Sequence, residues 1–241
     1  MKSKLLILLS VIFLFSCSKK DDNSTSGSKK PLVKTFSEEN IILGSFWYDS
    51  QGRVTCCRLF ESPDIDSTVY LYGTDNLVRT TYINGKLQEI EHGSLENGKV
   101  VSSKGNKADS SSFWSHYYTY DENGYLIREI ELNKDSVERW REDYQIKDGN
   151  YISMTHRDNN TQSVFTYEYY PGTSNSLKSM GSLVLSKFYE STNLVKKVEF
   201  SFDSIQPVTE EFSYTRYDNG WVKTMTETSG SHTSTVTFTY W

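Results

Sequence analysis

The sequence predicts an all-β protein: a water-soluble antiparallel meander of about 14–16 strands, built from repeated hairpins and closed into a barrel or a flattened barrel. Three observations carry this prediction. Apolar and polar residues alternate along most of the chain, Asn-Gly and Asp-Gly pairs separate the alternating runs, and the turn glycines are evenly spaced. A sheet of this width usually closes, because closure removes the exposed edges through which sheets aggregate.

The hairpin turns are the strongest local signal. A tight type I′ turn needs positive φ angles at both central residues, and asparagine, aspartate and glycine tolerate such angles best. The clearest hairpin covers residues 118–130, where two strand-like runs meet in an Asn-Gly pair. Five pairs of this kind stand between alternating runs: Asn84-Gly85, Asn97-Gly98, Asn123-Gly124, Asp148-Gly149 and Asn219-Gly220.

The turns also indicate an internal repeat. Successive turn glycines are 26, 25 and 23 residues apart, at Gly98, Gly124, Gly149 and Gly172. This spacing accommodates two strands and two short connections. A phrase of Tyr-Asp, a short gap, glycine and an apolar residue recurs with its tyrosine at Tyr48, Tyr120 and Tyr217. We interpret the pattern as repeated hairpins; the alternative is an antiparallel protein whose turns are evenly spaced without repetition.

Strand character is visible in the alternation itself. Val236, Phe238 and Tyr240 share one face of a strand whose other face carries threonines, which is typical of an antiparallel sheet with one wet face. Proline cannot donate to the hydrogen-bond ladder. We therefore expect all four prolines to fall between strands: Pro31, Pro63, Pro171 and Pro207.

The N-terminal segment has the layout of an export signal. Residues 1–16 contain two lysines followed by an apolar run that is too short to span a bilayer stably. The end of the run, Leu-Phe-Ser before Cys17, resembles a bacterial lipobox, and this resemblance implies that Cys17 is lipidated. An ordinary cleaved signal is the alternative. Residues 17–35 are predicted as a flexible tether and residues 36–241 as a single all-β repeat domain.

Charge restricts the partners. Loss of residues 1–16 removes two lysines and no acid, so the net charge goes from −5 to −7. An acidic chain without a basic cluster argues against nucleic-acid binding. The expected membrane contact is through the N-terminal lipid alone.

Two resemblances follow from these motifs. Residues 48–55, Tyr-Asp-Ser-Gln-Gly-Arg-Val-Thr, look like a unit of the YD (Rhs-type) repeats of bacterial surface proteins. The lysine-then-acid run at residues 18–23 looks like the tag that Bacteroidetes-type lipoproteins carry after the lipidated cysteine, which implies the outer face of the outer membrane. The whole chain resembles a Bacteroidetes lipoprotein family of unknown function with a porin-like fold. That resemblance implies a barrel and supplies no activity or site residues.

Catalytic and metal-binding motifs are missing from the sequence. Neighbouring Cys56 and Cys57 project to opposite faces of a strand, so we expect two structural thiols rather than a strained disulfide. No histidine stands at ligand spacing to another histidine, cysteine or acid, so neither a metal nor a cofactor is expected. Three acid pairs resemble glycosidase carboxylates only if they converge across a cleft: Asp64 with Asp66, Glu142 with Asp143, and Glu210 with Glu211.

Aromatic residues give the only candidate site. The chain holds 17 tyrosines, 12 phenylalanines and five tryptophans, and rigid aromatic rings with polar tips suit sugar stacking and interface contacts. Trp114, His116 and Tyr118 share one face of a strand whose other face carries Phe113 and Tyr117. We take the first three as candidate ligand-binding residues and expect an exposed patch on this strand.

The sequence thus favours a non-enzymatic, lipid-anchored surface protein that serves as a binding or structural module, with a glycan or a protein as its possible ligand. One alternative is a surface glycan-binding or glycan-degrading accessory protein. The other is an outer-membrane barrel, because the aromatic end of the chain resembles the last strand of such barrels. Charges on both faces of residues 136–146 argue against lipid contact.

Overall fold

The computed structural model describes residues 31–61, 63–180, 190–202 and 206–241. In chain order its elements are β1 (Val33–Glu38), β2 (Ile41–Tyr48), β3 (Val54–Glu61), β4 (Asp64–Tyr72), β5 (Asn76–Ile83), β6 (Lys86–Glu96), β7 (Lys99–Lys107), β8 (Phe113–Tyr120), β9 (Leu126–Asn133), β10 (Glu138–Lys147), β11 (Asn150–Asp158), β12 (Gln162–Ser174), the 3-10 helix η1 (Lys178–Met180), β13 (Asn193–Phe202), β14 (Val208–Arg216), β15 (Val222–Ser229) and β16 (His232–Tyr240).

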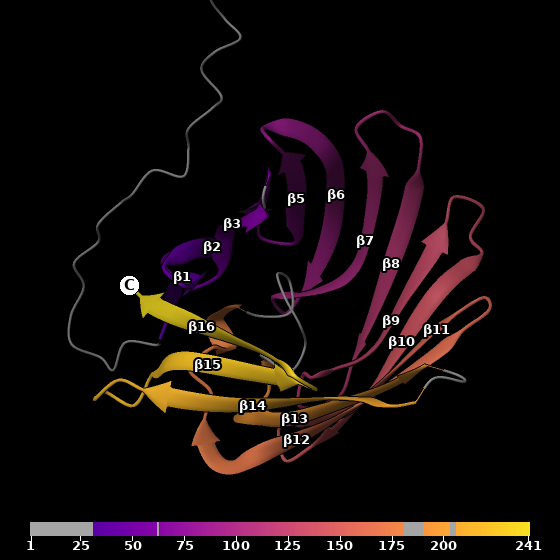
Figure 1. The fold of residues 1–241 in the computed structure, drawn as a ribbon. Coiled ribbons are helices and arrows are strands. Elements are labelled where there is room, and N and C mark those ends of the chain that lie inside the picture. Colours follow the sequence, from indigo (N-terminus) through magenta and orange to yellow (C-terminus); the bar gives the residue numbers. More distant parts are fainter. Residues whose placement is uncertain (1–30, 62, 181–189, 203–205) are drawn as a thin grey trace, which may run out of the picture.

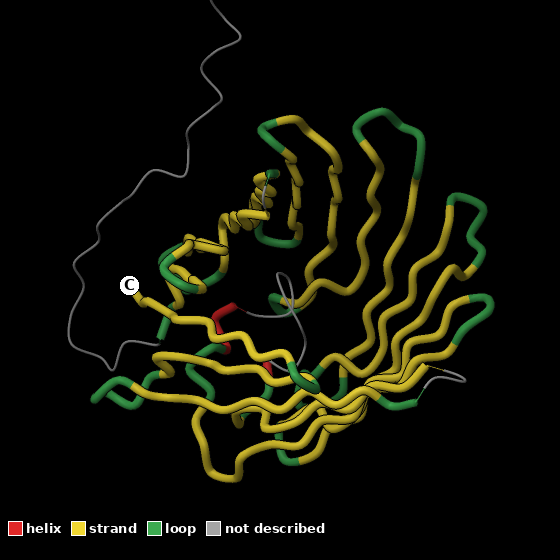
Figure 2. The backbone as a smooth tube through the Cα atoms, viewed as in Figure 1, coloured by secondary structure: helices red, strands yellow, loops and turns green. Residues whose placement is uncertain are grey.

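The strands form one closed antiparallel barrel in which each strand pairs with its neighbours in sequence. The barrel closes where β1 pairs with β16, with Phe36 opposite Phe238 and Glu38 opposite Val236. Figure 2 shows strand over most of the described chain, with loops at the strand ends and little helix. The predicted all-β meander and its closure are confirmed.

The meander gives the barrel two distinct ends. Connections that follow even-numbered strands lie at one end together with both ends of the described chain, where the backbone N–H of Trp241 donates to the carbonyl of Leu32 at 3.1 Å. We call this the terminal end. Connections that follow odd-numbered strands lie at the other end, called the far end. Figure 1 shows the β5–β6 and β7–β8 hairpins reaching away from the C terminus.

The predicted boundary between the tether and the β domain, at residue 36, is three residues too late, because β1 already begins at Val33. Val33 is completely buried, and the backbone N–H of this residue donates to Ser179 Oγ at 3.0 Å. The predicted tether therefore ends before Val33 where it meets the barrel. The predicted signal sequence and Cys17 lie outside the described residues.

The predicted hairpin turns divide into two kinds. Asn84-Gly85, Asn97-Gly98 and Asp148-Gly149 have the positive φ angles of a type I′ turn at both residues. At Asn123-Gly124 and Asn219-Gly220 only the glycine has a positive φ, so the type I′ prediction is wrong there. These turns are longer: the N–H of Gly124 donates to the Asp121 carbonyl at 3.0 Å, and the N–H of Gly220 to the Tyr217 carbonyl at 2.9 Å.

The recurring Tyr-Asp phrase marks this longer turn. The N–H of Gly52 donates to the Asp49 carbonyl at 3.0 Å, which is the same bond as at Gly124. Asp49 Oδ1 and Asp121 Oδ1 also accept from the backbone four residues on, at Arg53 and Tyr125 respectively. The Tyr-Asp motif at these two positions thus forms the same turn at the terminal end, in which the aspartate side chain accepts backbone hydrogen bonds. Whether it reflects a repeat in the evolutionary sense stays a prediction.

One proline departs from the prediction, because Pro171 lies inside β12. The ladder between β12 and β13 passes from the pair Tyr169–Val195 directly to Ser174–Asn193. Pairing between β12 and β11 ends earlier still, at Thr166. Pro171 therefore stands in an irregular stretch where its missing N–H leaves no paired ladder position empty.

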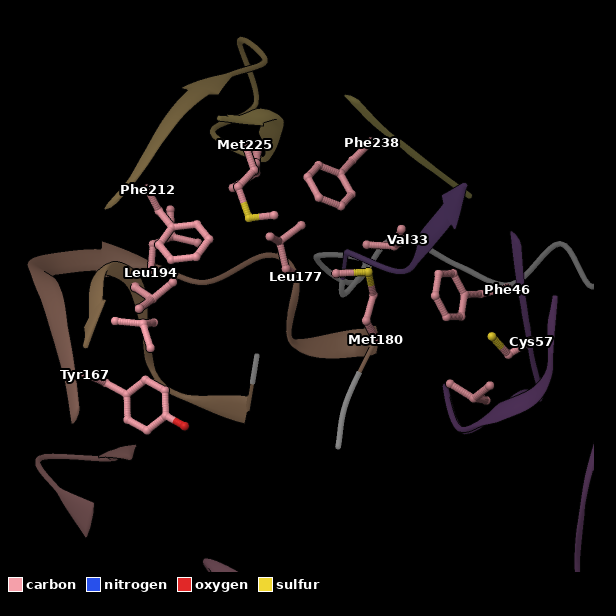
Figure 3. Close-up of a cluster of buried hydrophobic side chains, with 14 of the residues drawn as sticks. Val33, Phe46, Cys57, Tyr167, Leu177, Met180, Leu194, Phe212, Met225 and Phe238 are labelled. Atoms are coloured by element: carbon pink, nitrogen blue, oxygen red, sulfur yellow. The ribbon is translucent and has the colours of Figure 1, made fainter. Parts of the chain in front are cut away.

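The hydrophobic core fills the terminal half of the barrel. Figure 3 shows Leu177 and Met180, both carried by the β12–β13 connection, between Phe212 and Phe238 on one side and Phe46 on the other. All five side chains are buried. Because both strand walls pack against the described residues of this connection, 175–180 and 190–192, these residues act as a plug that completes the core.

Hydrogen bonds hold the plug in place. The backbone N–H of Tyr151 donates to Ser191 Oγ at 3.1 Å, and Ser191 Oγ in turn donates to the Tyr169 hydroxyl at 2.8 Å. On the opposite wall the N–H of Val222 donates to Ser176 Oγ at 2.9 Å. The plug therefore satisfies buried backbone groups of strands on both sides.

The outer wall is polar where side-chain contacts define it. Threonine pairs connect neighbouring strands near the barrel seam, with Oγ1 atoms 2.7 Å apart for Thr35 and Thr239 and 2.6 Å apart for Thr215 and Thr224. On β9–β11, Asp143 stands between several arginines, listed with their distances: Arg128 at 2.6 Å, Arg141 at 3.2 Å and Arg157 at 2.7 Å. The outer wall is therefore polar at these positions.

Within the part of the chain that the structure describes, no helix is long and apolar enough to cross a membrane.

A candidate ligand-binding site in the far half of the barrel

Strand register defines the inner face of the far half. Directly opposed residues of antiparallel strands project to the same side of the sheet. One row of such residues faces inward and extends across neighbouring strands from β7 to β11: Ser103, His116, Glu131, Trp140 and Asp158. The next row, one step deeper, runs from β8 to β13: Tyr118, Glu129, Glu142, His156, Ser163 and Phe202. Polar and aromatic groups therefore converge on one part of the interior.

His116 lies between two carboxylates. Its Nδ1 is 3.1 Å from Glu129 Oε1 and its Nε2 is 3.3 Å from Glu131 Oε2. Glu131 is shared, because Arg139 Nη1 stands 2.7 Å from its other oxygen. The Tyr118 ring stacks on His116 with centroids 6.0 Å apart, and burial, followed by the charge of Glu129, raises the pKa of the Tyr118 hydroxyl. That hydroxyl is therefore neutral at physiological pH.

Trp140 connects this histidine to a second one. Its ring contacts His116 edge-on at a centroid distance of 5.4 Å and His156 at 5.8 Å. His156 Nδ1 is 3.3 Å from Glu142 Oε1, and the Tyr144 hydroxyl donates to Glu142 Oε2. His156 and Glu142 keep 29% and 23% of their side-chain surface exposed. Because both face inward, water reaches this part of the interior.

A further inward-facing carboxylate, Glu91, lies on β6 between β5 and β7. Glu91 is buried, and Arg79 Nη2 lies 2.6 Å from its Oε2. The Ser103 hydroxyl donates to Glu91 Oε1. A buried carboxylate needs such partners, since its desolvation is otherwise costly. Arg79 keeps about a third of its side chain exposed, at 34%, so it connects the buried acid to water.

Phenylalanines and acids complete the inner wall. Phe165, Phe200 and Phe202 form a mutual ring cluster with centroid distances of 5.7 to 6.5 Å. Beside it, Glu210 pairs across the ladder with buried Val198 and therefore faces inward. Burial, followed by the charge of Glu227, raises the pKa of Glu210. This part of the wall thus combines aromatic faces with carboxylates that repel each other.

The three candidate residues lie on this inner face rather than on an exposed patch. Trp114 is only 9% exposed, and its ring lies on Gly105, where an added Cβ would stand 2.5 Å from a ring atom. His116 keeps 12% of its side chain exposed. The exposed aromatic face of β8 is the opposite one, with Phe113 at 49% and Tyr117 at 45%. Alternation along β8 thus follows the prediction, and the exposed aromatic side is the one that does not carry the three candidate residues.

Sequence reasoning missed most of the other residues in the site. Glu129, Glu131, Trp140, Glu142 and His156 come from three further strands, and only the barrel register places them beside His116. The alternation of Trp140, Glu142 and Tyr144 on one face of β10 was available in the sequence. It could not show that this face turns inward.

The acid pairs noted in the sequence make structural contacts instead of forming a catalytic pair. Asp64 Oδ1 accepts from the Asn84 side chain at 2.6 Å and so braces a far-end turn. Glu142 and Asp143 face opposite sides of β10, where Glu142 contacts His156 and Asp143 contacts outer arginines. Within the described structure, none of the three acid pairs has two carboxylates that converge across a cleft.

The two neighbouring cysteines are both buried thiols. Cys57 pairs across the ladder with Phe46 in the core, whereas Cys56 pairs with Trp47 on the other face of β3. Burial raises the pKa of Cys57 to about 12, which keeps the thiol protonated and unreactive.

Chemically, the site offers rings, imidazoles and carboxylates that are already engaged with one another. Among the described residues, no group of three or more His, Cys, Asp or Glu is arranged to hold a metal ion. The carboxylates of Glu129, Glu131 and Glu142 all contact a histidine. The arrangement is suited to binding, with ring faces for stacking and carboxylates for donors and cations.

Comparison with known proteins supports the fold. A porin-like protein from Bacteroides uniformis ATCC 8492, known from a crystal structure, superposes with a TM-score of 0.65 at 16% identity, over 82% of this chain and 90% of that one. A porin-like protein from Bacteroides vulgatus ATCC 8482 gives a TM-score of 0.58 at 11% identity, over 88% and 99% of the two chains. No protein-family model and no curated protein matches the sequence. At these identities the similarity establishes a porin-like barrel fold.

Proposed function

We propose that this protein is a lipid-anchored, water-soluble barrel on the outer face of the bacterial outer membrane that binds a ligand in the far half of its interior, without transforming it. The observation that carries the proposal is the ring cluster around Trp140. Inward-facing histidines, carboxylates and aromatic rings meet there and remain partly exposed to water. A closed structural barrel would need only an apolar interior.

The position of the N terminus supports anchoring by a lipid on Cys17. Val33 begins β1 at the terminal end, which the plug fills. Residues 17–32 can extend by about 3.3–3.6 Å each, enough to hold the barrel clear of a membrane surface. The far half then faces away from the anchored end, toward the medium that contains the ligand.

The polar outer wall supports a barrel that stands in water. A strand in contact with lipid needs an apolar outer face, whereas Arg128, Arg141 and Arg157 surround Asp143 on the outside of β9–β11. This charged cluster is the argument against the outer-membrane barrel. Residues 31–241 contain every strand of the closed barrel, so we expect this fragment to stay soluble without detergent. Precipitation that only detergent reverses would favour the spanning barrel.

The anchor has its own test. In the full-length chain, Cys17→Ala should abolish incorporation of labelled palmitate and release the protein from the membrane fraction. Protease added to intact cells should degrade the wild-type barrel if it is on the cell surface. Unchanged membrane retention of the Cys17→Ala chain would contradict lipid anchoring.

Ligand binding is tested through Trp140. Residues 31–241 would be titrated with a panel of soluble oligosaccharides and peptides while tryptophan fluorescence is recorded. We expect a ligand whose affinity falls at least tenfold in Trp140→Leu, because stacking on an aromatic ring contributes about 0.5–1.5 kcal/mol beyond the apolar area that it buries. Trp47→Leu is the matched control, since Trp47 lies on the outer face of β2 beside Arg58. Equal losses in both variants would contradict the assignment.

A glycan-degrading accessory protein is the second candidate. It is favoured by the carboxylates of Glu131 and Glu142 beside Trp140, a combination that glycosidases also use. Their contacts with His116, Arg139 and His156 argue for binding instead. Product analysis after incubation with the glycan panel decides: hydrolysis that Glu142→Gln abolishes would overturn the non-enzymatic proposal.

A further inference from the structure

The far end of the barrel carries an apolar rim. Of the large apolar side chains that are exposed in the described structure, most lie within two residues of a far-end turn: Ile41, Ile42, Ile65, Ile83, Leu87, Phe113, Val137, Phe202 and Val208. These residues come from six connections around the barrel, so the rim surrounds much of the far end. The remaining exposed large apolar residues of the described ranges lie elsewhere: Leu71, Tyr117, Tyr217 and Trp241. Concentrated exposed apolar surface of this kind marks a contact site.

Behind this rim the inner wall is acidic. The strand register turns the following acids inward in the far half: Glu38, Asp66, Glu89, Glu91, Glu129, Glu131, Glu142, Glu210 and Glu227. Basic groups on the same described face are fewer: Arg79, Lys86, Lys107 and Arg139. The interior behind the rim therefore has a negative potential that attracts cations.

Three of these acids, on β1, β14 and β15, have no lysine or arginine partner within the described chain. Glu38 Oε1 accepts from the Ser234 hydroxyl at 2.5 Å. Glu210 is adjacent to Glu227, and no ion pair joins a lysine or arginine of the described chain to Glu38, Glu210 or Glu227. A cation placed among these carboxylates would relieve their mutual repulsion, and the adjacent phenylalanine rings would contact it favourably.

Charge decides which partner the rim can accept. A second copy docked rim to rim would bring two acidic interiors together, and such like-charge contact is unfavourable. An anionic lipid surface is repelled for the same reason. A positively charged partner with apolar side chains satisfies both the rim and the interior.

Size favours a polypeptide over a small amine. A small cation could reach Glu210 and Glu227 but would leave the rim residues of most hairpins uncovered. A peptide segment can place large apolar side chains on the rim while a lysine or arginine enters the interior. We propose that the far end of the barrel docks a basic, apolar-rich polypeptide segment. This inference rests on the proposed binding function and names the class of its ligand.

A pair of designed peptides tests the inference. A dye-labelled peptide of alternating lysine and leucine and its glutamate–leucine counterpart would be titrated with residues 31–241, and fluorescence anisotropy would be recorded. We expect only the lysine peptide to bind. The double variant Glu210→Gln/Glu227→Gln should weaken binding at least fivefold through lost charge. The rim variant Ile65→Thr/Ile83→Thr should weaken it by a similar factor through lost apolar contact.

Non-specific attraction to an acidic chain is excluded by a matched control. Glu168→Gln removes an outer-wall carboxylate that lies 3.8 Å from Lys197 Nζ, and we expect it to leave the affinity unchanged. Equal weakening by Glu168→Gln and by the Glu210/Glu227 double variant would overturn the inference. Binding that the rim variant leaves unaltered would overturn it as well, as would equal affinity for the acidic peptide.

The outcome is separable from that of the proposed function. An oligosaccharide that binds through Trp140, together with no binding of the lysine peptide, would overturn this inference and leave the proposed function standing. Rim-to-rim dimers in analytical ultracentrifugation, or flotation with phosphatidylglycerol vesicles, each abolished by Ile65→Thr/Ile83→Thr, would assign the rim to another partner and overturn it too.

Discussion

The two halves of the barrel interior differ in what fills them. In the terminal half, Phe46, Leu177, Met180 and Phe238 form a dry core in which Leu177 and Met180 of the β12–β13 connection are as buried as the strand residues. In the far half the same strands face inward with glutamates, histidines and aromatic rings that water reaches. One set of strands therefore supplies a dry core and a polar inner face, which separates the stabilising core from the proposed binding site along the barrel axis.

The largest expected contrast in unfolding free energy is between side chains of the core and side chains of the polar inner face. Phe46→Ala should lower the free energy of unfolding by about 3–5 kcal/mol, because a fully buried ring leaves a cavity. Trp140→Leu should cost only about 1 kcal/mol, because the ring is partly exposed and leucine replaces much of its apolar surface. Urea denaturation of residues 31–241 followed by circular dichroism measures both. Similar losses of unfolding free energy in the two variants would contradict the division of the interior into a core half and a polar half.

The plug sharpens the comparison. Leu177→Ala should cost about 2–4 kcal/mol, because the side chain is buried between opposite walls of the barrel. Its neighbour Lys178 is exposed, so Lys178→Ala should change stability by no more than about 0.5 kcal/mol. The same denaturation experiment gives the answer. If Leu177→Ala were neutral, the connection would be a surface loop rather than part of the core.

Buried tyrosines predict a pH limit for the terminal half. Burial raises the pKa of Tyr72, Tyr120 and Tyr240 to about 12, compared with about 10 in an unfolded chain. Below pH ~10 both states keep these protons, so the stability contribution is fully present. Between pH ~10 and ~12 the unfolded chain loses protons that the folded chain retains, so stability falls as pH rises through that interval.

The urea midpoint should therefore be level from pH 7 to about 9 and decline above pH ~10. Tyr120→Phe removes one of the titrating groups and should make the decline shallower, at the cost of the hydrogen bond to the Val100 carbonyl. A midpoint that stays level up to pH 12 in the wild type would show that these hydroxyls are not buried.

The smallest expected effect is on the outer wall of the far half. Asp143→Asn removes the charge that faces Arg128, Arg141 and Arg157, and we expect a loss of about 1 kcal/mol or less, because exposed ion pairs are weak. The loss should shrink at 0.5 M NaCl, where screening is stronger. A large, salt-independent loss would instead indicate a structural role for Asp143 in strand pairing.

How far the sequence predicts this protein is clearest at β8. Its alternation placed Trp114, His116 and Tyr118 on one face and Phe113 and Tyr117 on the other, and the structure has this arrangement. The sequence could not say which face turns inward, because both are aromatic. It also could not place His156 near Trp140, since that contact depends on the register of β10 against β11.

Local chemistry by itself determined the strands, most of their turns and the closure of a wide sheet, because alternation and positive-φ residues act over a few positions. Tertiary structure alone decided which rows face inward, that a connection plugs one end, and that apolar residues of separate hairpins form one rim. The reason is physical: inward direction, plugging and rim formation depend on the registers of all strands around the closed barrel, which no local pattern specifies.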